Sequence, residues 1–192
     1  MTNNTLLVRL RNETRARHEQ TEKLLYADTI RAGTLSRTEY EQLLLMHYLF
    51  HQALETAVAV QAVFFAGCDR IARQKTPWLV ADLKRLGVPL PEPRPELFAD
   101  WNAYQLLGAM YVAEGSTLGG QVIAKALAQT PGLSEVIASS QFFIGYGEQT
   151  GLRWKIFGVY LTNRADNYAD DVVDAANRAF GTYSEITSSY ER

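Results

Sequence analysis

One histidine of the sequence, His18, stands among residue types that suit a metal-centred ligand carrying carboxylates. Arg15 lies one helical turn before it and Arg11 two turns before it, and at 100° per residue both project within about 60° of the histidine. Imidazole binds metals, and guanidinium groups pair well with carboxylates. Glu22, one turn after His18, could accept a hydrogen bond from the second ring nitrogen and fix its tautomer. The pattern indicates a large planar ligand with a metal at its centre.

The same segment has a plainer interpretation, which the sequence leaves open. His18 continues an apolar stripe that includes Leu7 and Leu10, and a single histidine on such a face is more often a core residue than a ligand. Arg9 and Arg17 show that arginine is common in this segment, so a solvated helix face is the alternative for its basic residues.

A second pattern is GSTLGGQ, residues 115–121, inside a run that is otherwise helical. Glycine costs about 1 kcal/mol relative to alanine in a helix interior, so several glycines here are unfavourable for a helix alone. Gly108, Gly115 and Gly119 project within about 40° of one another. We expect a strip of bare backbone and a kink, against which either a flat ligand or a neighbouring helix packs closely.

Two other patterns are weaker. His47 and His51 have the i, i+4 spacing of metal ligands on one helix face, but no second Glu-x-x-His pair completes a di-metal site. We therefore expect partly buried or exposed histidines. Residues 115–120 have the spacing of a phosphate loop, but Gln121 and Val122 stand where Lys and Ser or Thr are needed.

Helical periodicity runs through nearly the whole chain and predicts the elements that hold these residues. The first helix is expected over about 4–26. Ser36 and Glu39 predict a capping box that starts a helix over about 37–66. Further helices are expected over about 68–86, with Pro77 as a candidate break, and over about 100–129, 133–143 and 150–163, with a last one after Asp166. Four prolines between residues 89 and 95 mark an extended connector. The prediction is an all-α single domain, residues 1–192, with seven or eight helices.

Composition excludes several classes of protein. With 19 basic and 21 acidic residues the formal net charge is −2, and a nucleic-acid partner is not expected. The single cysteine, Cys68, excludes an intramolecular disulfide and a cysteine-rich zinc site. No signal peptide and no run of 18 apolar residues is recognisable, so we expect a cytoplasmic protein with no membrane partner.

Three segments together resemble the heme oxygenase family, and its bacterial branch that supplies biliverdin to bacteriophytochromes most closely. They are LRNETRARHEQTE at 10–22, YVAEGSTLGGQVI at 111–123 and FFIGYGEQTGLRWKIF at 142–157. The resemblance implies a helical bundle with heme between the first helix and a glycine-kinked later helix. It also implies O2-dependent cleavage of heme b, both cofactor and substrate, to biliverdin, CO and ferrous iron. Electrons would come from an external reductase or ferredoxin, and a bacteriophytochrome could receive the biliverdin.

The resemblance also assigns roles to individual residues. His18 matches the axial ligand of the heme iron, and Glu22 matches its acidic partner. The residues expected on the distal, catalytic side are Gly115, Ser116, Gly119 and Gly120. The other expected heme contacts are Arg11, Arg15, Tyr111, Arg153, Lys155 and Phe180, of which Arg153 and Lys155 are alternatives for one basic contact.

One departure keeps other functions open. Animal members of the family carry an aspartate directly after the first distal glycine, where this chain has Ser116, so the group that organises distal water is Ser116, Thr117 or backbone carbonyls. The first alternative is a heme carrier or sensor without turnover. Others are a thiaminase-like hydrolase, for which Cys68 is a poor nucleophile, a di-iron oxidase, and a helical interaction module.

Overall fold

The computed structural model describes residues 5–190, which form ten α-helices, three short 3-10 helices and no strand. The longer elements are α1 (Leu6–Glu13), α2 (Arg15–Leu24), α4 (Arg37–Val60), α5 (Thr76–Leu86), α6 (Ala103–Leu127), α9 (Thr150–Ala165) and α10 (Ala169–Tyr190). Short helices α3 (Ala27–Ala32), α7 (Ser134–Ala138) and α8 (Gln141–Ile144) connect them. The all-α class is confirmed, with more helices than the seven or eight predicted.

The predicted first helix is divided at Thr14, so the expectation of one continuous helix over 4–26 is wrong in this detail. The Thr14 hydroxyl donates to the Leu10 carbonyl at 2.7 Å, a local bond that bends helices. Main-chain hydrogen bonds continue through the bend, from the Thr14 amide to Leu10 and from the His18 amide to Thr14. The bend separates Arg11 on α1 from Arg15 and His18 on α2.

Local signals explain most helix boundaries. The capping box at the start of α4 is confirmed: the Ser36 hydroxyl accepts from the Glu39 amide, and the Glu39 carboxylate accepts from the Ser36 amide. α4 ends at Val60 rather than near 66, and the helix expected over 68–86 begins only at Thr76. Pro77 explains that start, because proline is tolerated in the first turn of a helix but not inside one.

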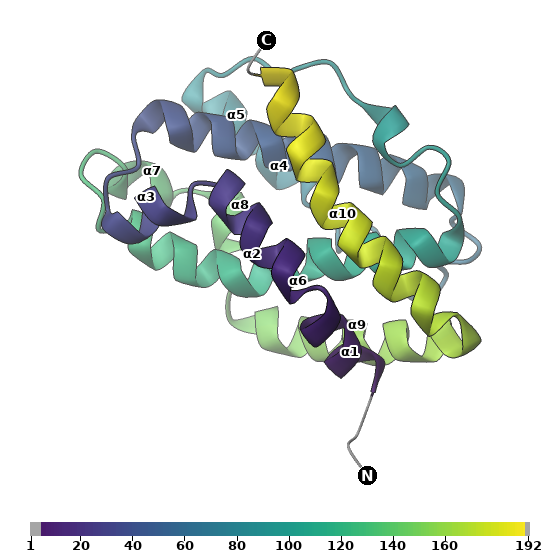
Figure 1. Ribbon diagram of the computed structural model, residues 1–192. Coiled ribbons are helices and arrows are strands. Elements are labelled where there is room, and N and C mark those ends of the chain that lie inside the picture. The colour runs from purple at the N-terminus through teal and green to yellow at the C-terminus, as the bar shows by residue number, and fades with distance from the viewer. Residues whose placement is uncertain (1–4, 191–192) are drawn as a thin grey trace.

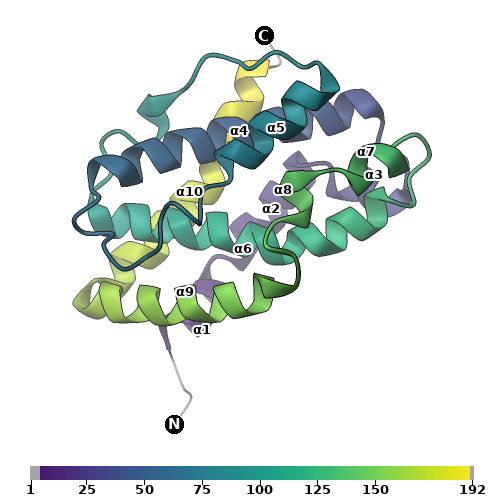
Figure 2. The same cartoon turned by 180° about the vertical axis from the view of Figure 1, so that it is seen from behind.

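α6 is the central element of the bundle. α10 packs most extensively against it, while α9 lies along one side and α4 with α5 along the other (Figures 1 and 2). α1 and α2 lie beside α10 (Figure 1), and both contact it. α6 is helical throughout, and its axis changes direction near the middle (Figure 2), as the cluster of glycines predicts.

The three glycines of the expected strip, Gly108, Gly115 and Gly119, do not all face the same neighbour: Gly108 packs against another helix, and the other two do not. A Cβ atom at Gly108 would lie 2.4 Å from the Val172 carbonyl oxygen and 2.9 Å from the Ala175 Cβ, both on α10. Gly108 therefore allows α10 to approach the α6 backbone, which is the neighbouring-helix alternative. Only Gly115 and Gly119 remain for a ligand.

One core helix is apolar enough to be mistaken for a membrane span. Among the helices within residues 5–190, only α4 has the required length and hydropathy, and 67 % of its apolar window is buried inside the protein. Its burial against α5, α6 and α10 identifies it as a core element.

Candidate functional site

A cavity of about 1150 Å³ separates the first two helices from α6. α4, α8 and α10 complete its walls through Leu43, His47, Phe142, Phe143 and Tyr183. The cavity brings together most of the residues singled out from the sequence, namely Arg11, Arg15, His18, Glu22, Tyr111, Gly115, Ser116, Gly119 and Phe180. Segments separated by about a hundred residues along the chain therefore form one site.

His18 forms part of the α2 wall, and 52 % of its side chain is accessible. Its ring meets the Phe180 ring edge-on, with 5.3 Å between the centroids. The Thr21 hydroxyl donates to the Phe180 carbonyl at 3.1 Å and ties α2 to α10 behind the histidine. The Nε2 atom of His18 lies 3.6 Å from a Glu22 carboxylate oxygen, which is too long for a hydrogen bond. A small movement of either side chain would bring the two atoms within hydrogen-bond distance.

The rim of the cavity beside His18 is basic. Arg15 is largely exposed and donates to the Glu19 carboxylate at 2.8 Å, which lowers the pKa of that carboxyl group. Arg11 is exposed, and within residues 5–190 no carboxylate forms an ion pair with it. Burial raises the pKa of the Tyr111 hydroxyl, and the charge of Arg11 acts in the opposite direction. The two guanidinium groups thus line the same rim. Arg15 is paired with Glu19, whereas Arg11 forms no ion pair within residues 5–190.

The α6 wall facing the cavity is bare backbone. A Cβ atom at Gly119 would meet nothing within 4 Å, and one at Gly115 would meet only the Trp154 ring, at 3.9 Å. The Ser116 hydroxyl donates to the Ala113 carbonyl at 2.8 Å, and the Thr117 hydroxyl donates to the Glu114 carbonyl at 2.7 Å. The hydroxyl protons of both residues are therefore used within the helix.

Three predicted site residues lie outside the cavity. Gly120 is buried, and its face of α6 packs against α8, where a Cβ would lie 3.6 Å from the Phe143 carbonyl. Arg153 lies over the Tyr146 ring, 5.0 Å from its centroid, and Lys155 is exposed on α9. Neither Arg153 nor Lys155 is among the residues that line this cavity, so a contact of either one with a ligand stays a prediction.

The two histidines of α4 are buried, and the expectation of partly buried or exposed positions is wrong. His47 is 6 % exposed and lines the cavity, with its Nδ1 atom 3.0 Å from the Tyr183 hydroxyl oxygen. His51 is 1 % exposed, one turn further along α4. Burial lowers the pKa of His47 to about 3 and that of His51 well below its ordinary value, so both rings are neutral at pH 7. The i, i+4 spacing found this pair, but it did not reveal its burial.

A neighbouring face of α6, about 100° around the helix from Gly115, is held by buried charges. The Glu114 carboxylate pairs with Arg73 at 2.5 Å and also with Lys75, and all three side chains are almost fully buried. The Tyr146 hydroxyl donates to the same carboxylate at 3.1 Å. Arg73 and Lys75 belong to the loop before α5, so this cluster fixes that loop to α6 one residue before Gly115.

Cys68, in the same loop, is not suited to nucleophilic chemistry. It is 2 % exposed, and burial raises the pKa of its thiol to about 11. A thiol in this state stays protonated at neutral pH, whereas the thiolate is the nucleophile. The hydrolase alternative therefore has no activated cysteine. Within the described part of the chain, no three His, Cys, Asp or Glu side chains are grouped to hold a metal ion.

The residue types that line the cavity match those that a flat macrocycle carrying a metal and carboxylates would need. An imidazole stands on one wall, bare backbone on another, and guanidinium groups on the rim, while the remaining lining is largely apolar and aromatic. Such a ligand would be held by metal coordination at His18, by contact with Gly115 and Gly119, and by charge at Arg11 and Arg15. Ligand pockets of this kind combine an apolar lining with a few placed polar groups.

Comparison with known proteins agrees with this chemistry. The family described as "Heme oxygenase" matches residues 4–189. A protein named heme oxygenase from Xanthomonas campestris pv. campestris (strain 8004) is 28 % identical over 167 residues, covering 83 % of this chain and 95 % of that protein. A solved structure of the NO- and CO-bound heme oxygenase from Neisseria meningitidis matches with a TM-score of 0.75 and 20 % identity, covering 96 % of this chain and 90 % of the other. This last likeness concerns the fold.

Proposed function

The chain belongs to the heme oxygenase family, and we propose from this premise how its residues bind and orient heme for cleavage. It is an enzyme that degrades heme, and heme is both its substrate and its cofactor. Bound heme supplies a redox-active iron together with the macrocycle that is oxidised. The observation that carries the proposal is the placement of His18 and of the bare backbone at Gly115 and Gly119 on the walls of one cavity.

On the α2 side, His18 is the proposed axial ligand of the heme iron. One neutral ring nitrogen would coordinate the iron, and the other would donate to Glu22, whose carboxylate already lies 3.6 Å away. A carboxylate in that position fixes the tautomer and makes the ligand more basic. Phe180 packs edge-on against the histidine ring and limits its rotation.

At the rim, Arg11 and Arg15 are proposed to bind the heme propionates. Arg11 can bind a propionate without leaving another partner, because no carboxylate pairs with it within residues 5–190. Arg15 would have to share its guanidinium with Glu19 or leave that partner, which is 56 % exposed. Charge-assisted hydrogen bonds from two arginines would set which edge of the macrocycle faces solvent.

On the α6 side, the missing side chains of Gly115 and Gly119 let the helix approach the face of the heme. Bulk at either position would push the macrocycle away from α6 or exclude it. Ser116 stands where animal members carry an aspartate, and its hydroxyl proton is committed to the Ala113 carbonyl. Its oxygen can still accept a hydrogen bond from water in the cavity.

We also propose the products, the electron donor, the recipient of biliverdin and the cellular location. The family relationship supports release of biliverdin, CO and ferrous iron, with O2 and electrons delivered by an external reductase or ferredoxin. A bacteriophytochrome as recipient of biliverdin, and the cytoplasm as the location, rest on the resemblance to the bacterial branch. A heme carrier without turnover is the second candidate, and the family match over residues 4–189 does not favour it.

A titration with hemin tests the site. Wild-type protein should bind one equivalent and develop a Soret band. His18→Ala removes the proposed iron ligand and should lose the band or weaken binding by at least about tenfold, which corresponds to about 1.4 kcal/mol. Lys155→Ala, an exposed change outside the cavity, is the matched control. With a reductase, NADPH and O2, loss of the band together with new biliverdin absorbance identifies turnover. A stable band without biliverdin would favour the carrier.

A second variant tests the α6 wall. Gly119→Leu places a side chain in the open part of the cavity and should lower heme affinity while the heme-free fold is retained. Gly151→Leu is the matched control, because this α9 glycine is also helical and uncrowded but lies outside the cavity. Equal heme affinity for the two variants would show that heme does not contact Gly119.

A further inference from the structure

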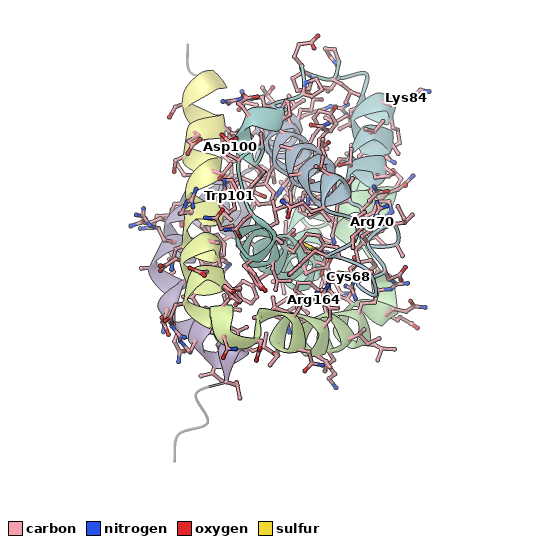
Figure 3. The ribbon with its side chains drawn as sticks, turned by 90° about the vertical axis from the view of Figure 1, so that its right-hand side faces the viewer. Cys68, Arg70, Lys84, Asp100, Trp101 and Arg164 are labelled. Carbon is pink, nitrogen blue, oxygen red and sulfur yellow. The ribbon has the colours of Figure 1, made fainter. Side chains whose placement is uncertain are left out.

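A fully buried carboxylate lies on α5, outside the large cavity proposed to hold heme, which we call the heme cavity. Asp82 is 0 % exposed and is not among the residues that line this cavity. Lys84, which follows about 200° further around the helix, is exposed and points away from the bundle (Figure 3). An aspartate is almost never fully buried unless it is paired or hydrogen-bonded. The partners of Asp82 therefore indicate its role.

These partners lie mainly at the start of α8, 58 to 60 residues further along the chain. One carboxylate oxygen of Asp82 accepts from the Ser140 hydroxyl at 2.8 Å and from the Phe142 amide at 3.0 Å. The other oxygen accepts from the Gln141 amide at 2.8 Å and from Arg85 at 3.0 Å. The first amides of a helix have no partner within that helix. Asp82 supplies the missing partner from a neighbouring helix.

α8 depends on contacts from outside, because it has only four residues, Gln141–Ile144. A helix of this length is not stable alone. The Ser140 hydroxyl accepts from the Phe143 amide at 3.3 Å, and the same hydroxyl donates to Asp82. The amides of residues 141, 142 and 143 are therefore bound either to Asp82 or to the serine that bonds to Asp82.

The residues held in this way form an aromatic wall of the heme cavity. Phe142 and Phe143 both line the cavity, with 5.1 Å between their ring centroids and 71° between the ring planes. The Phe142 ring lies 4.7 Å from the His47 ring, and the Phe143 carbonyl lies against Gly120 of α6. The position of this wall thus depends on how α8 is held.

Heme in the cavity needs more than one contact to fix its rotation. A bond at His18 would leave the nearly square macrocycle free to turn about that bond. Arg11 and Arg15 are exposed at the rim and would hold only the edge that carries the propionates. The buried edge would meet the lining, to which Phe142 and Phe143 contribute buried rings. The meso carbon that is placed for oxidation depends on this rotation.

We propose that Asp82 is a positioning residue for heme cleavage. Through the first turn of α8 it fixes the rings of Phe142 and Phe143, and these rings limit the rotation of heme and so select the meso carbon that is oxidised. Asp82 does not line the cavity, so it acts only through α8. The inference rests on the proposed function, because it concerns the orientation of heme in the same cavity.

The contact between Asp82 and α8 can be tested without heme. In Asp82→Ala, the amides of residues 141 and 142 lose their acceptor, and their hydrogen exchange measured by NMR should become at least about tenfold faster, since hydrogen bonds to charged groups are the stronger ones. Exchange in α9 should not change. Lys84→Ala, an exposed change on the same helix, is the matched control. Wild-type protection of both amides in Asp82→Ala would overturn the proposal.

The orientation of heme can be measured in the ferric, cyanide-bound complex with hemin. The hyperfine-shifted ¹H NMR signals of the heme methyl groups report rotation of the macrocycle without any turnover. Wild-type protein should show one major set of signals. Asp82→Ala should add a second set with at least about one-tenth of its intensity, which corresponds to orientations within about 1.4 kcal/mol of each other. A single, unchanged set would contradict the proposal.

The products give a second measure of orientation. With a reductase, NADPH and O2, chromatography should show a mixture of biliverdin isomers for Asp82→Ala where the wild type forms mainly one. Leu83→Ala is the control for stability, because Leu83 is also 0 % exposed on α5 and lies outside the cavity. Its truncation leaves a void and weakens the fold, but the wild-type isomer should persist. The same mixture from Leu83→Ala would show that lost stability alone changes the product, against the proposal.

The path through α8 is tested at its two rings. Phe142→Leu and Phe143→Leu leave the bonds of Asp82 in place, and at least one of them should shift the isomers as Asp82→Ala does. Wild-type products from both variants would rule out this path. If Asp82→Ala does not fold, Asp82→Asn supplies the comparison, because it keeps one acceptor oxygen and turns an NH2 group toward the donors at the other position.

The outcomes separate this inference from the proposed function. Wild-type protein that binds hemin but forms no biliverdin would overturn the proposed turnover, while the methyl signals would still show whether Asp82 fixes the orientation. Normal turnover with wild-type methyl signals and isomers in Asp82→Ala would overturn this inference and leave the proposed function intact.

Discussion

Two consecutive residues of α6, Glu114 and Gly115, face opposite environments. Glu114 is 2 % exposed and holds two buried cations and a tyrosine hydroxyl, while Gly115 presents bare backbone to a cavity of about 1150 Å³. One face is saturated with charge and hydrogen bonds, and the other has almost no contacts of its own. The difference indicates how a helix segment of low intrinsic stability can carry a binding surface. The contacts of Glu114 hold the segment in place, and Gly115 remains free to face the cavity.

The physical reason lies in helix propensity. Glycines at 115, 119 and 120 weaken α6 by about 1 kcal/mol each relative to alanine, so the segment needs stabilisation from its surroundings. Buried ion pairs do not add much net stability, but they specify one arrangement, because any other leaves a charge buried and unpaired. We infer that Glu114 sets the position of the wall that Gly115 and Gly119 present to heme.

The largest expected effect comes from breaking the charged face. Glu114→Ala leaves Arg73 and Lys75 buried without their carboxylate and should lower the free energy of unfolding by about 3 to 5 kcal/mol. Urea denaturation of the heme-free protein measures this. Asp28→Ala, which breaks the exposed pair with Arg31, is the control and should leave the midpoint unchanged. Equal midpoints for both variants would contradict the role assigned to the cluster.

The buried histidines give the next effect, through pH. Their folded-state pKa values lie below 6.5, so below pH 6.5 the unfolded chain takes up protons that the folded chain does not, and stability is lost as pH falls. Between pH 7 and 5 the loss should be about 2 kcal/mol for each histidine. Glu55 offsets part of it, because its raised pKa has the opposite sign. Urea denaturation of His51→Phe should show about half the histidine loss. An unchanged slope would mean that His51 is protonated in the folded state.

The third experiment distinguishes a glycine of α6 that packs against α10 from a glycine that faces the cavity. Gly108→Ala puts a methyl group 2.4 Å from a backbone oxygen of α10, which cannot move as a side chain would. Stability should fall by about 1 to 3 kcal/mol, the usual cost of overpacking, while heme affinity stays close to that of the wild type. Thermal unfolding and a hemin titration measure the two quantities. A stabilised Gly108→Ala would show that α10 lies further from α6.

Gly119→Ala should give the smallest effect, with the opposite sign. Its Cβ would enter open space, so the heme-free protein should gain up to about 1 kcal/mol from the higher helix propensity of alanine. Heme affinity should fall, because the methyl group occupies the surface against which heme lies. A gain in stability together with unchanged heme affinity would place heme elsewhere in the cavity.

Much of the architecture could be predicted from local sequence. The capping box of Ser36 and Glu39 starts α4 where it was expected, and periodicity identified the helices that became α4, α6, α9 and α10. Predicted helix ends failed where a single residue decides them. Thr14 bends the first helix through its own hydroxyl, and Pro77 allows α5 to begin only at Thr76.

The site was predictable where one helix holds several of its residues. Arg15, His18 and Glu22 share α2, so their spacing predicted that they would lie together, and the cavity contains all three. Arg153 and Lys155 were carried over with a motif on α9, whose orientation the sequence does not specify, and neither lines the cavity. Gly108 was grouped with Gly119 by angle alone, although α10 covers only the first.

The sequence by itself determined the helical class, the placement of His18 with its flanking charges, and the positions in α6 that lack side chains, because periodicity and residue type act within a few turns of one helix. Only the tertiary structure decided which glycines face a cavity, that His47 and His51 are buried and neutral, and that Arg73 and Lys75 meet Glu114 across about forty residues of chain. These properties depend on which helix covers which face. That choice arises from packing between segments distant in sequence, which short-range spacing does not encode.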